Sequence, residues 1–316
     1  MSLPIGYPDV EAAAARIAPY VHRTPTFSSM TLNTQLGANV FFKAENLQKV
    51  GAFKARGATN AILQLPSDAT GVVTHSSGNH GQAVAYAAAI RDLPAWIVMP
   101  RTAPELKVEA VRSYGAEIVL CDHADRETTA AKVVEQTGAV LIHPFDNPEV
   151  IAGQGTATLE FIEQVPDLDV IVAPIGGGGL LSGAATVAAA RDPAIPAIGA
   201  EPFAVDDAFR SLRSGQRLAG VVDPVTTADG LLTGIGARPF AILSALEAEV
   251  IRVTETSILE AALFYLQRMK LVVEPSGATS LAALRTEPDR FSGLRVGVII
   301  SGGNTDLSWL DAALRL

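Results

Sequence analysis

Residues 170–192 read VIVAPIGGGGLLSGAATVAAARD. An apolar run rich in β-branched residues leads into four glycines, Gly176, Gly177, Gly178 and Gly179, and then into an alanine-rich stretch. This order predicts a buried strand, a tight loop and a helix. Four consecutive glycines carry an entropic cost, which is tolerable where the backbone must approach a ligand closely. Bare N–H groups at a helix start bind anions, so the stretch predicts a phosphate cradle, with a flexible connection as the alternative.

The same alternation of apolar runs and helical stretches continues along the chain. Alanine-rich stretches such as 81–92 and 180–192 separate the runs, which favours an α/β fold with mostly parallel sheets flanked by helices. About nine strands exceed one minimal α/β unit, so we expect two open twisted sheets. The runs rich in Val and Ile lie at 39–43, 71–77, 95–100, 117–122, 140–145, 170–175, 197–202, 250–255 and 295–301.

Composition limits the classes of partner. The 316 residues are 48% hydrophobic, which supports a sizeable core, and the net charge of −9 argues against nucleic acid as the main partner. Cys121 is the only cysteine, which excludes an intrachain disulfide and fits a reducing compartment. The N-terminus has no secretory pattern, and no uncharged apolar stretch reaches about 18 residues. We therefore expect a soluble cytoplasmic protein that does not bind a membrane.

Ligands of open α/β sheets bind beyond the carboxyl ends of the strands, and three strand exits here are unusual. They read GNHGQA after 71–77, GGGGLLSG after 170–175 and GGNTD after 295–301. None fits a dinucleotide fingerprint, because Ser182 stands where the third glycine would follow Gly177 and Gly179, and no GxxxxGK[ST] occurs. A single phosphomonoester therefore fits the glycine cradle better than a nicotinamide cofactor or ATP.

The first of these exits has two interpretations. Ser76, Ser77, Gly78 and Asn79 precede a helix that we expect to begin near His80. Serine and asparagine at this position are ordinary helix caps. The same N–H groups and hydroxyls could instead hold a substrate carboxylate.

The stretch KAENLQKVGAFKARGA (43–58) contains three lysines of different context. Lys54 lies in the expected first turn of a helix that runs to about Leu65, where the helix dipole disfavours a cation. That field, with burial beside Phe53, would lower the pKa of Lys54, as a Schiff-base lysine requires. Lys43 and Lys49 lack this context and are expected at the surface. A lysine imine with one phosphate anchor meets the requirement of pyridoxal phosphate.

These motifs together resemble the fold type II pyridoxal-phosphate enzymes, and among them the threonine/serine dehydratase and serine racemase family. The resemblance covers nearly the whole chain, with the motifs in the order of the family. It implies a large domain of residues 1–69 and 147–316 and a small inserted domain of residues 70–146, with the cofactor between them. The motifs are FKARGA (53–58), SSGNHGQA (76–83), GGGGLLSG (176–183), VEPSGA (273–278) and SGGN (301–304).

The resemblance also implies a role for individual residues. Lys54 would form the internal aldimine, and Phe53 would pack near the cofactor. The cofactor's phenolic oxygen, phosphate and pyridine nitrogen would be met by Asn79, by Gly176–Gly179 with Leu180, and by Ser301, with Glu274 near the ring. The substrate carboxylate pocket would consist of Ser76, Ser77, Gly78, His80 and Gly153.

A cation site and an oligomeric state follow from the same resemblance. Glu201, Asp207 and the main-chain carbonyl of Val205 align with a divalent-cation site, whose oxygen ligands suit Mg²⁺ or Ca²⁺. The alternative for the two carboxylates is a solvated acidic loop. The family expectation for the assembly is a homodimer.

Three features depart from the pattern of the family. Ala52 stands where many relatives carry serine, and Phe145 in HPFDNP (143–148) stands where serine racemases tend to have asparagine. We expect Phe145, the segment 216–236 and the loop after Pro202 to shape the substrate pocket. Few residues follow SGGN, so we expect no C-terminal regulatory domain.

The implied reaction is the β-elimination of water from a small β-hydroxy amino acid such as L-threonine or L-serine, which gives a 2-oxo acid and ammonia. Lys54 would remove the α-proton, and the cofactor phosphate would protonate the departing hydroxyl. Ser301 would leave the ring less electron-withdrawing than a carboxylate would, which suits elimination.

Other activities stay open on the sequence alone. Ser77, as a second-face acid/base, would allow a serine racemase with side elimination. A 3-hydroxyaspartate dehydratase and a catalytically silent amino-acid or cofactor binding protein are further alternatives, and the intact Lys54 argues against the last.

Overall fold

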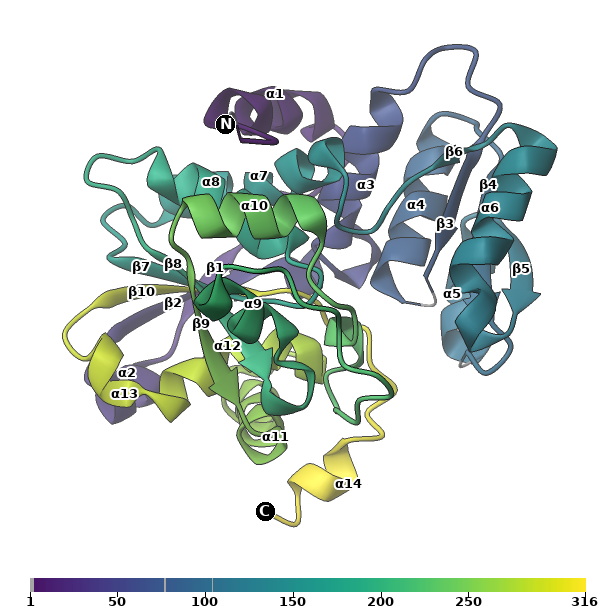
Figure 1. The fold of residues 1–316 in the computed structure, drawn as a ribbon. Coiled ribbons are helices and arrows are strands. Elements are labelled where there is room, and N and C mark those ends of the chain that lie inside the picture. Colours follow the sequence, from purple (N-terminus) through teal and green to yellow (C-terminus); the bar gives the residue numbers. More distant parts are fainter. Residues whose placement is uncertain (1–2, 77, 104) are drawn as a thin grey trace.

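The chain forms two α/β parts that lie side by side (Figure 1). This computed structural model describes residues 3–76, 78–103 and 105–316. The strands are β1 (Thr26–Ser28), β2 (Asn39–Ala44), β3 (Val72–His75), β4 (Ala95–Pro100), β5 (Glu117–Cys121), β6 (Val140–Leu141), β7 (Val170–Pro174), β8 (Ala197–Pro202), β9 (Glu249–Val253) and β10 (Arg295–Ile300).

The helices connect and cover these strands. In chain order they are α1 (Tyr7–Ile17), α2 (Met30–Leu36), α3 (Lys54–Leu63), α4 (Asn79–Ile90), α5 (Glu105–Ser113), α6 (Arg126–Thr137), α7 (Pro148–Gln164), α8 (Gly179–Ala189), α9 (Asp207–Ser214), α10 (Ala237–Ala245), α11 (Glu255–Phe264), α12 (Pro275–Thr286), α13 (Pro288–Phe291) and α14 (Leu310–Ala313).

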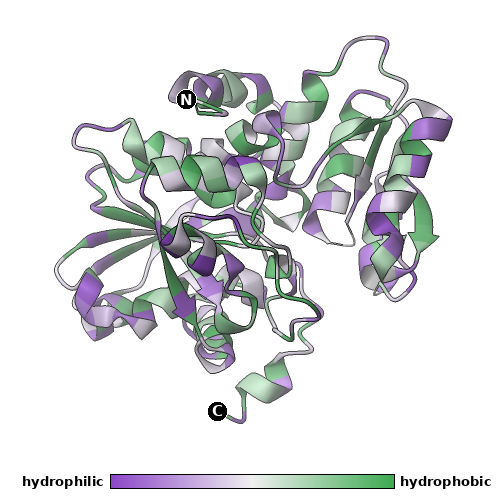
Figure 2. Cartoon of the chain, viewed as in Figure 1, coloured by the Kyte–Doolittle hydropathy of each residue, from purple (hydrophilic) through white to green (hydrophobic). Residues whose placement is uncertain are grey.

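The larger sheet has six strands in the order β1-β2-β10-β7-β8-β9. All its neighbouring pairs are parallel except β1 with β2. Along β7 the side chains alternate between two cores, since Val170 and Val172 face α11 and α12 while Ile171 and Ala173 face α8. The strand is therefore apolar on both faces, as its sequence indicates, and Figure 2 shows the hydrophobic strands inside the helical layers.

The smaller sheet has four parallel strands in the order β5-β4-β3-β6. Its apolar side chains divide between a cluster with α3, α4 and α5 and a cluster with α6. The prediction of two mostly parallel sheets is confirmed, although β6 is shorter than expected and the antiparallel edge strand β1 was not predicted. All four strands lie within 70–146, but α3 outside that segment shares their core, so the proposed domain boundary stays a prediction.

Helix α3 joins the two parts, because it packs against α7 of the larger part and α4 of the smaller part (Figure 1). Its first residue is Lys54, so this helix places the lysine at the junction. Among the described residues, no helix combines the length and the apolar character that crossing a bilayer requires.

Candidate active site

A cavity of about 890 Å³ lies at the junction, beyond the carboxyl ends of strands from both sheets. Most of the predicted site residues line it. A second, more open hollow of about 390 Å³ lies by the ends of α9 and α10, but Glu247 is the only titratable residue among its described lining residues. The predicted residues in the larger cavity are Phe53, Lys54, Ser76, Gly78, Asn79, His80, Gly176, Gly177, Gly178, Gly179, Leu180, Glu274 and Ser301.

The Lys54 amine is enclosed by protein although the residue borders the cavity. Nζ donates a hydrogen bond to the carbonyl of Pro144 at 2.8 Å and lies 5.1 Å from the centroid of the Phe53 ring. Burial lowers the pKa of Lys54 from 10.5 to about 8. In the part of the chain that the structure describes, no carboxylate pairs with this amine. A buried lysine without a counter-charge is suited to react as the free amine.

Gly176, Gly177 and Gly178 lie in the loop between β7 and α8, and Gly179 is the first residue of α8. Gly178 has φ +88° and is the N-cap of α8, with no side-chain cap. A Cβ on Gly177 would lie 2.2 Å from the ring of Phe145, and one on Gly176 would lie 3.0 Å from the Cα of Leu231. Only bare peptide units fit here, so the N–H groups at the start of α8 stay open toward the cavity, as a phosphate group requires.

Three further helices begin at this cavity. The N-caps of α3, α4 and α12 are Phe53, Gly78 and Glu274, and none of them makes a side-chain cap hydrogen bond. The Ser76 hydroxyl accepts from the N–H of Gly78 at 3.3 Å rather than capping α4 from the N-cap position. Ser77 lies outside the described residues. The positive ends of four helices thus surround the cavity and favour anions there.

A hydrogen-bonded chain of side chains links Asn304 to Asn79 and Glu274, the last two of which line the cavity. The Asn79 amide donates to Oε1 of Glu274 at 2.8 Å, and the Asn304 amide donates to Oδ1 of Asn79 at 2.8 Å. Burial raises the pKa of Glu274 to about 8, with the nearby charge of Asp229 adding to the rise. These bonds fix which end of the Asn79 amide is the donor.

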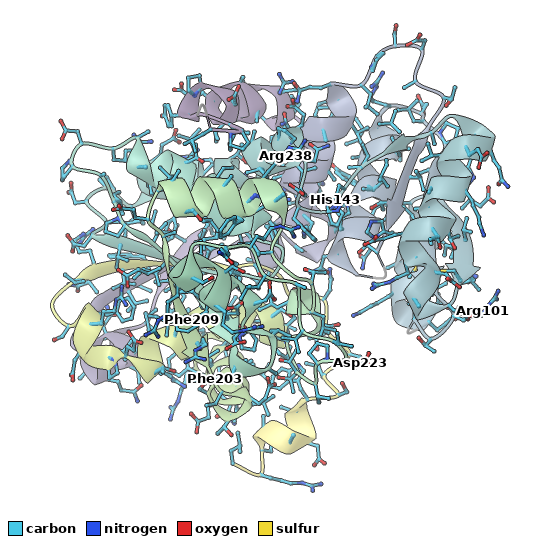
Figure 3. The ribbon with its side chains drawn as sticks, in the orientation of Figure 1. Arg101, His143, Phe203, Phe209, Asp223 and Arg238 are labelled. Atoms are coloured by element: carbon cyan, nitrogen blue, oxygen red, sulfur yellow. The ribbon has the colours of Figure 1, made fainter. Side chains whose placement is uncertain are left out.

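Histidines also border the cavity, and of these the sequence indicated a role for His80 but none for His75 or His143. His143, which Figure 3 places between the two parts of the molecule, accepts the N–H of Asp146 at 2.9 Å through Nδ1. Burial and the neighbouring His75 lower the pKa of His143 to about 4. His80 pairs with the carbonyl of Ile142 at 3.0 Å, and burial holds its pKa well below the usual value. His80 and His143 are therefore uncharged at neutral pH.

Gly153 does not belong to this cavity. It lies buried in α7, where a Cβ would come within 2.6 Å of the Cα of Gly57 and 2.7 Å of the Arg56 carbonyl. The close approach of α7 to α3 explains this glycine. The expectation that it borders the substrate pocket is therefore corrected.

Lys43 is also not where we expected it. The residue is fully buried, and Nζ bonds Glu160 at 2.8 Å and the carbonyl of Thr24 at 2.8 Å. Arg56 bonds both Glu160 and Glu45, so a network of buried ions ties α3 to α7 and β2. Lys43 directly follows the apolar residues 40–42 within β2, and this was the sequence signal that could have indicated its burial.

The predicted cation ligands lie together, and none of them is among the described residues that line the cavity. Both oxygens of Glu201 accept backbone N–H groups of α9, from Ala208 at 3.0 Å and Phe209 at 2.8 Å. Glu201 and Asp207 are 1% and 2% exposed, so they are not the solvated loop of the alternative. Burial raises the pKa of Glu201 to about 8 and raises that of Asp207. Val205 ends the short turn between them.

Several residues that shape the cavity were only partly foreseen. Phe145 and much of the segment 216–236 line it, as expected, and Asp223 of that segment is marked in Figure 3. Of the described residues in the loop after Pro202, none lines it; Phe203 lies on the larger part, away from His143 (Figure 3). Lys107 of α5 pairs with Asp229 across the cavity mouth, a contact between segments too distant in sequence to predict.

Comparison with known proteins places this arrangement in a family. A serine racemase of Dictyostelium discoideum is 46% identical over 313 residues, which cover 97% of each chain. A beta-hydroxyaspartate dehydratase of Paracoccus denitrificans (strain Pd 1222) is 45% identical over 96% of this chain and 98% of the relative. The crystal structure of a threonine deaminase from T.th. matches with a TM-score of 0.92 and 44% identity, over 96% of this chain and 100% of that one.

The family match spans the whole site. The sequence model described as "Pyridoxal-phosphate dependent enzyme" matches residues 17–302, which include Lys54, the glycine loop and Ser301. The chain therefore belongs to the family of pyridoxal-phosphate dependent enzymes, and its fold is the fold type II architecture of that family.

Proposed function

We propose that the protein is a dehydratase (ammonia-lyase) that eliminates water from a small β-hydroxy amino acid such as L-threonine or L-serine. One observation carries the proposal: the Lys54 amine, which pairs with no carboxylate of the described residues, shares a cavity with the uncapped N-termini of α4 and α8. An amine base, an anchor for a phosphate and an anchor for a carboxylate are thus within one enclosed space. The relatives named threonine deaminase and beta-hydroxyaspartate dehydratase support the reaction type.

The residues of the cavity fit pyridoxal phosphate. The peptide units of Gly176–Gly179 and Leu180 would hold the phosphate, Ser301 would face the pyridine nitrogen, and Asn79 would donate to the phenolic oxygen. Phe53 would pack on the ring beside Lys54. When bound, the cofactor supplies an electron sink for the α-carbon of an amino acid.

The chain's own groups would accept the α-proton and hold the substrate carboxylate. With a pKa of about 8, Lys54 is half unprotonated near that pH and can accept the α-proton of the substrate. The N–H groups of Gly78, Asn79 and His80 at the start of α4 would hold the substrate carboxylate, with Ser76 and Ser77. The β-hydroxyl would take a proton from the cofactor phosphate and leave as water, and the released enamine would hydrolyse to a 2-oxo acid and ammonia.

The reaction is tested by product analysis with a matched pair of lysine variants. We expect pyruvate from L-serine, 2-oxobutyrate from L-threonine and one ammonia per 2-oxo acid. Lys54→Ala should lose turnover by several orders of magnitude, because the amine is both attachment point and base. Lys49→Ala, in the same segment but outside the lining of the cavity, should keep it. Turnover retained in Lys54→Ala would contradict the proposal.

A serine racemase is the second candidate, and the 46% identity to a serine racemase favours it. Racemisation would need Ser77 to reprotonate the opposite face of the α-carbon. L-Serine in D₂O separates the two activities through the ratio of D-serine to pyruvate. Oxaloacetate from one 3-hydroxyaspartate isomer, with little product from L-serine, would instead identify a 3-hydroxyaspartate dehydratase.

We propose that Glu201, Asp207 and the carbonyl of Val205 hold Mg²⁺ or Ca²⁺. The two buried carboxylates have raised pKa values and accept backbone N–H groups, and a divalent cation would neutralise them. No group of three or more acidic, histidine or cysteine ligands occurs in the described part of the chain, so carbonyls and water must complete the shell. Thermal denaturation with Mg²⁺, Ca²⁺ or a chelator tests this site.

We also propose a cytoplasmic homodimer. The single cysteine fits a reducing compartment. Val222 and Val225 of the loop 216–234 are 85% and 87% exposed, an apolar surface that a second subunit could cover. Light scattering after size exclusion should give twice the mass of 33.0 kDa.

A further inference from the structure

The turn that leads into Lys54 has an unfavourable backbone conformation. Val50 has φ 55° and ψ 16°, and Gly51 follows with φ 69°. Glycine adopts this left-handed region without cost, whereas a β-branched residue there is a genuine outlier. Such strain persists only where the surrounding structure enforces it, and it concentrates at functional sites. Val50 stands three residues before Phe53 and four before Lys54.

The segment after β10 enforces this turn. The Asn304 amide donates to the carbonyl of Val50 at 2.6 Å, and the N–H of Gly303 donates to the carbonyl of Gly51 at 3.0 Å. A Cβ on Gly51 would lie 2.5 Å from Oδ1 of Asn304, so the amide packs directly on the turn. The N–H of Phe53 then donates to the carbonyl of Ser301 at 3.0 Å.

The same amide reaches a second group of the site. The Nδ2 atom of Asn304 also donates to Oδ1 of Asn79 at 2.8 Å, so both of its hydrogens are used. With its oxygen engaged, Asn79 directs its NH₂ group to Glu274, and one hydrogen of that group stays available. Asn304 itself is not among the described residues that line the cavity, so it acts through its neighbours.

We infer that Asn304 is a positioning residue that fixes two cavity groups with one side-chain amide. Through Val50 it holds the strained turn that aims Lys54, and through Asn79 it keeps a hydrogen-bond donor directed at the cavity. The geometric part is independent of the reaction, and only its effect on turnover rests on the proposed function. An aspartate of the same shape could not replace it, because a carboxylate has no N–H to donate.

The first test uses the full chain without cofactor and measures amide hydrogen exchange. Asn304→Ala should speed exchange of the Phe53 and Gly303 amides by about tenfold or more, since the turn loses its restraint. Val50→Gly combined with Asn304→Ala should restore slow exchange, because glycine needs no restraint in this conformation. Asn33→Ala is the control, because it removes a side-chain amide that accepts the Val40 N–H far from the cavity. It should leave the exchange rates of the Phe53 and Gly303 backbone N–H groups unchanged.

The second test uses the protein with bound pyridoxal phosphate. Asn304→Ala and Asn304→Asp should shift the visible absorbance of the lysine–cofactor Schiff base and its pH titration, because the donor to the phenolic oxygen is no longer fixed. The kcat should fall about tenfold or more with a smaller change in KM, as expected for misplaced catalytic groups. The strain-relieved double variant should recover part of kcat but keep the altered spectrum.

The outcomes separate this inference from the proposed function. Wild-type exchange rates and a wild-type spectrum in Asn304→Ala would overturn the inference, whatever the activity. Fast exchange that Val50→Gly fails to correct would overturn the role of strain. Faster exchange and an altered spectrum in a protein that releases no 2-oxo acid would support the inference and contradict the dehydratase.

Discussion

The glycine cradle makes a quantitative prediction for Gly177→Ala. The added methyl would lie 2.2, 2.3 and 2.6 Å from three carbons of the Phe145 ring, well inside contact distance. No positive φ is involved at Gly177, so crowding alone opposes the methyl group. Because the ring must move, overpacking should cost about 1–3 kcal/mol, which is about 5- to 150-fold in an equilibrium constant.

Two measurements separate crowding from phosphate binding. Urea unfolding without cofactor should show the loss in Gly177→Ala. The same substitution in a Phe145→Ala background should cost little relative to Phe145→Ala alone, because the methyl then has room. The affinity for pyridoxal phosphate, measured by fluorescence titration, should stay weak in the double variant, since a side chain still stands where bare peptide must approach the phosphate.

A glycine that has free space around it provides the control variant. Gly6→Ala adds a methyl whose nearest neighbour, Cδ of Pro8, is 3.5 Å away, so stability and cofactor affinity should stay close to wild type. Wild-type affinity for the cofactor in Gly177→Ala would refute the cradle. Unchanged urea stability would refute the packing against Phe145.

Three further predictions concern charged groups. In the cofactor-free protein, the rate at which a small aldehyde labels Lys54 should rise with pH and reach half its maximum near pH 8. At pH 7 this pKa gives about 300-fold more free amine than a pKa of 10.5 would. A half-maximum near pH 10 would contradict the burial of the amine. Arg56→Met leaves the buried Glu45 without its cation and leaves Glu160 with Lys43 alone, so it should cost about 3–5 kcal/mol in urea unfolding. Arg23→Met breaks an exposed pair and should cost under about 1 kcal/mol. Equal losses in the two variants would count against the network. Burial raises the pKa of Glu201 from 4.5 to about 8, so between these values the folded state binds a proton that the unfolded state does not. The free energy of unfolding of the metal-free protein should therefore fall as the pH rises from about 4.5 to 8. Glu201→Gln or saturating Mg²⁺ should weaken this pH dependence, and an unchanged pH dependence in both would argue against the site.

Much of the fold could be predicted because strong local signals agree with it. Apolar runs bounded by glycines became the strands of two parallel sheets, and the run at 170–175 is apolar on both faces because helices cover both. The edge strand β1 has three residues, too short for a periodic pattern. Its pairing with β2 depends on a contact between segments, which one sequence does not reveal.

In the site, too, residues with a local sequence signal could be predicted, and residues placed by distant contacts could not. The position of Lys54 and the glycine loop at the cavity could be predicted, because a lysine at a helix start and four consecutive glycines are unusual in themselves. Lys43 was misplaced because its partner Glu160 lies 117 residues away, and Gly153 was misassigned because two helices meet at that point. The bond from Lys54 to the Pro144 carbonyl spans 90 residues and has no local signature.

The most direct test of this active site is to map the residue to which the cofactor is covalently attached. The protein is incubated with pyridoxal phosphate, reduced with borohydride, digested and mapped by mass spectrometry. We predict a single stoichiometric adduct on the peptide that contains Lys54, and its loss in Lys54→Ala. An adduct on another lysine, or no adduct at all, would contradict the assignment of this cavity as the active site.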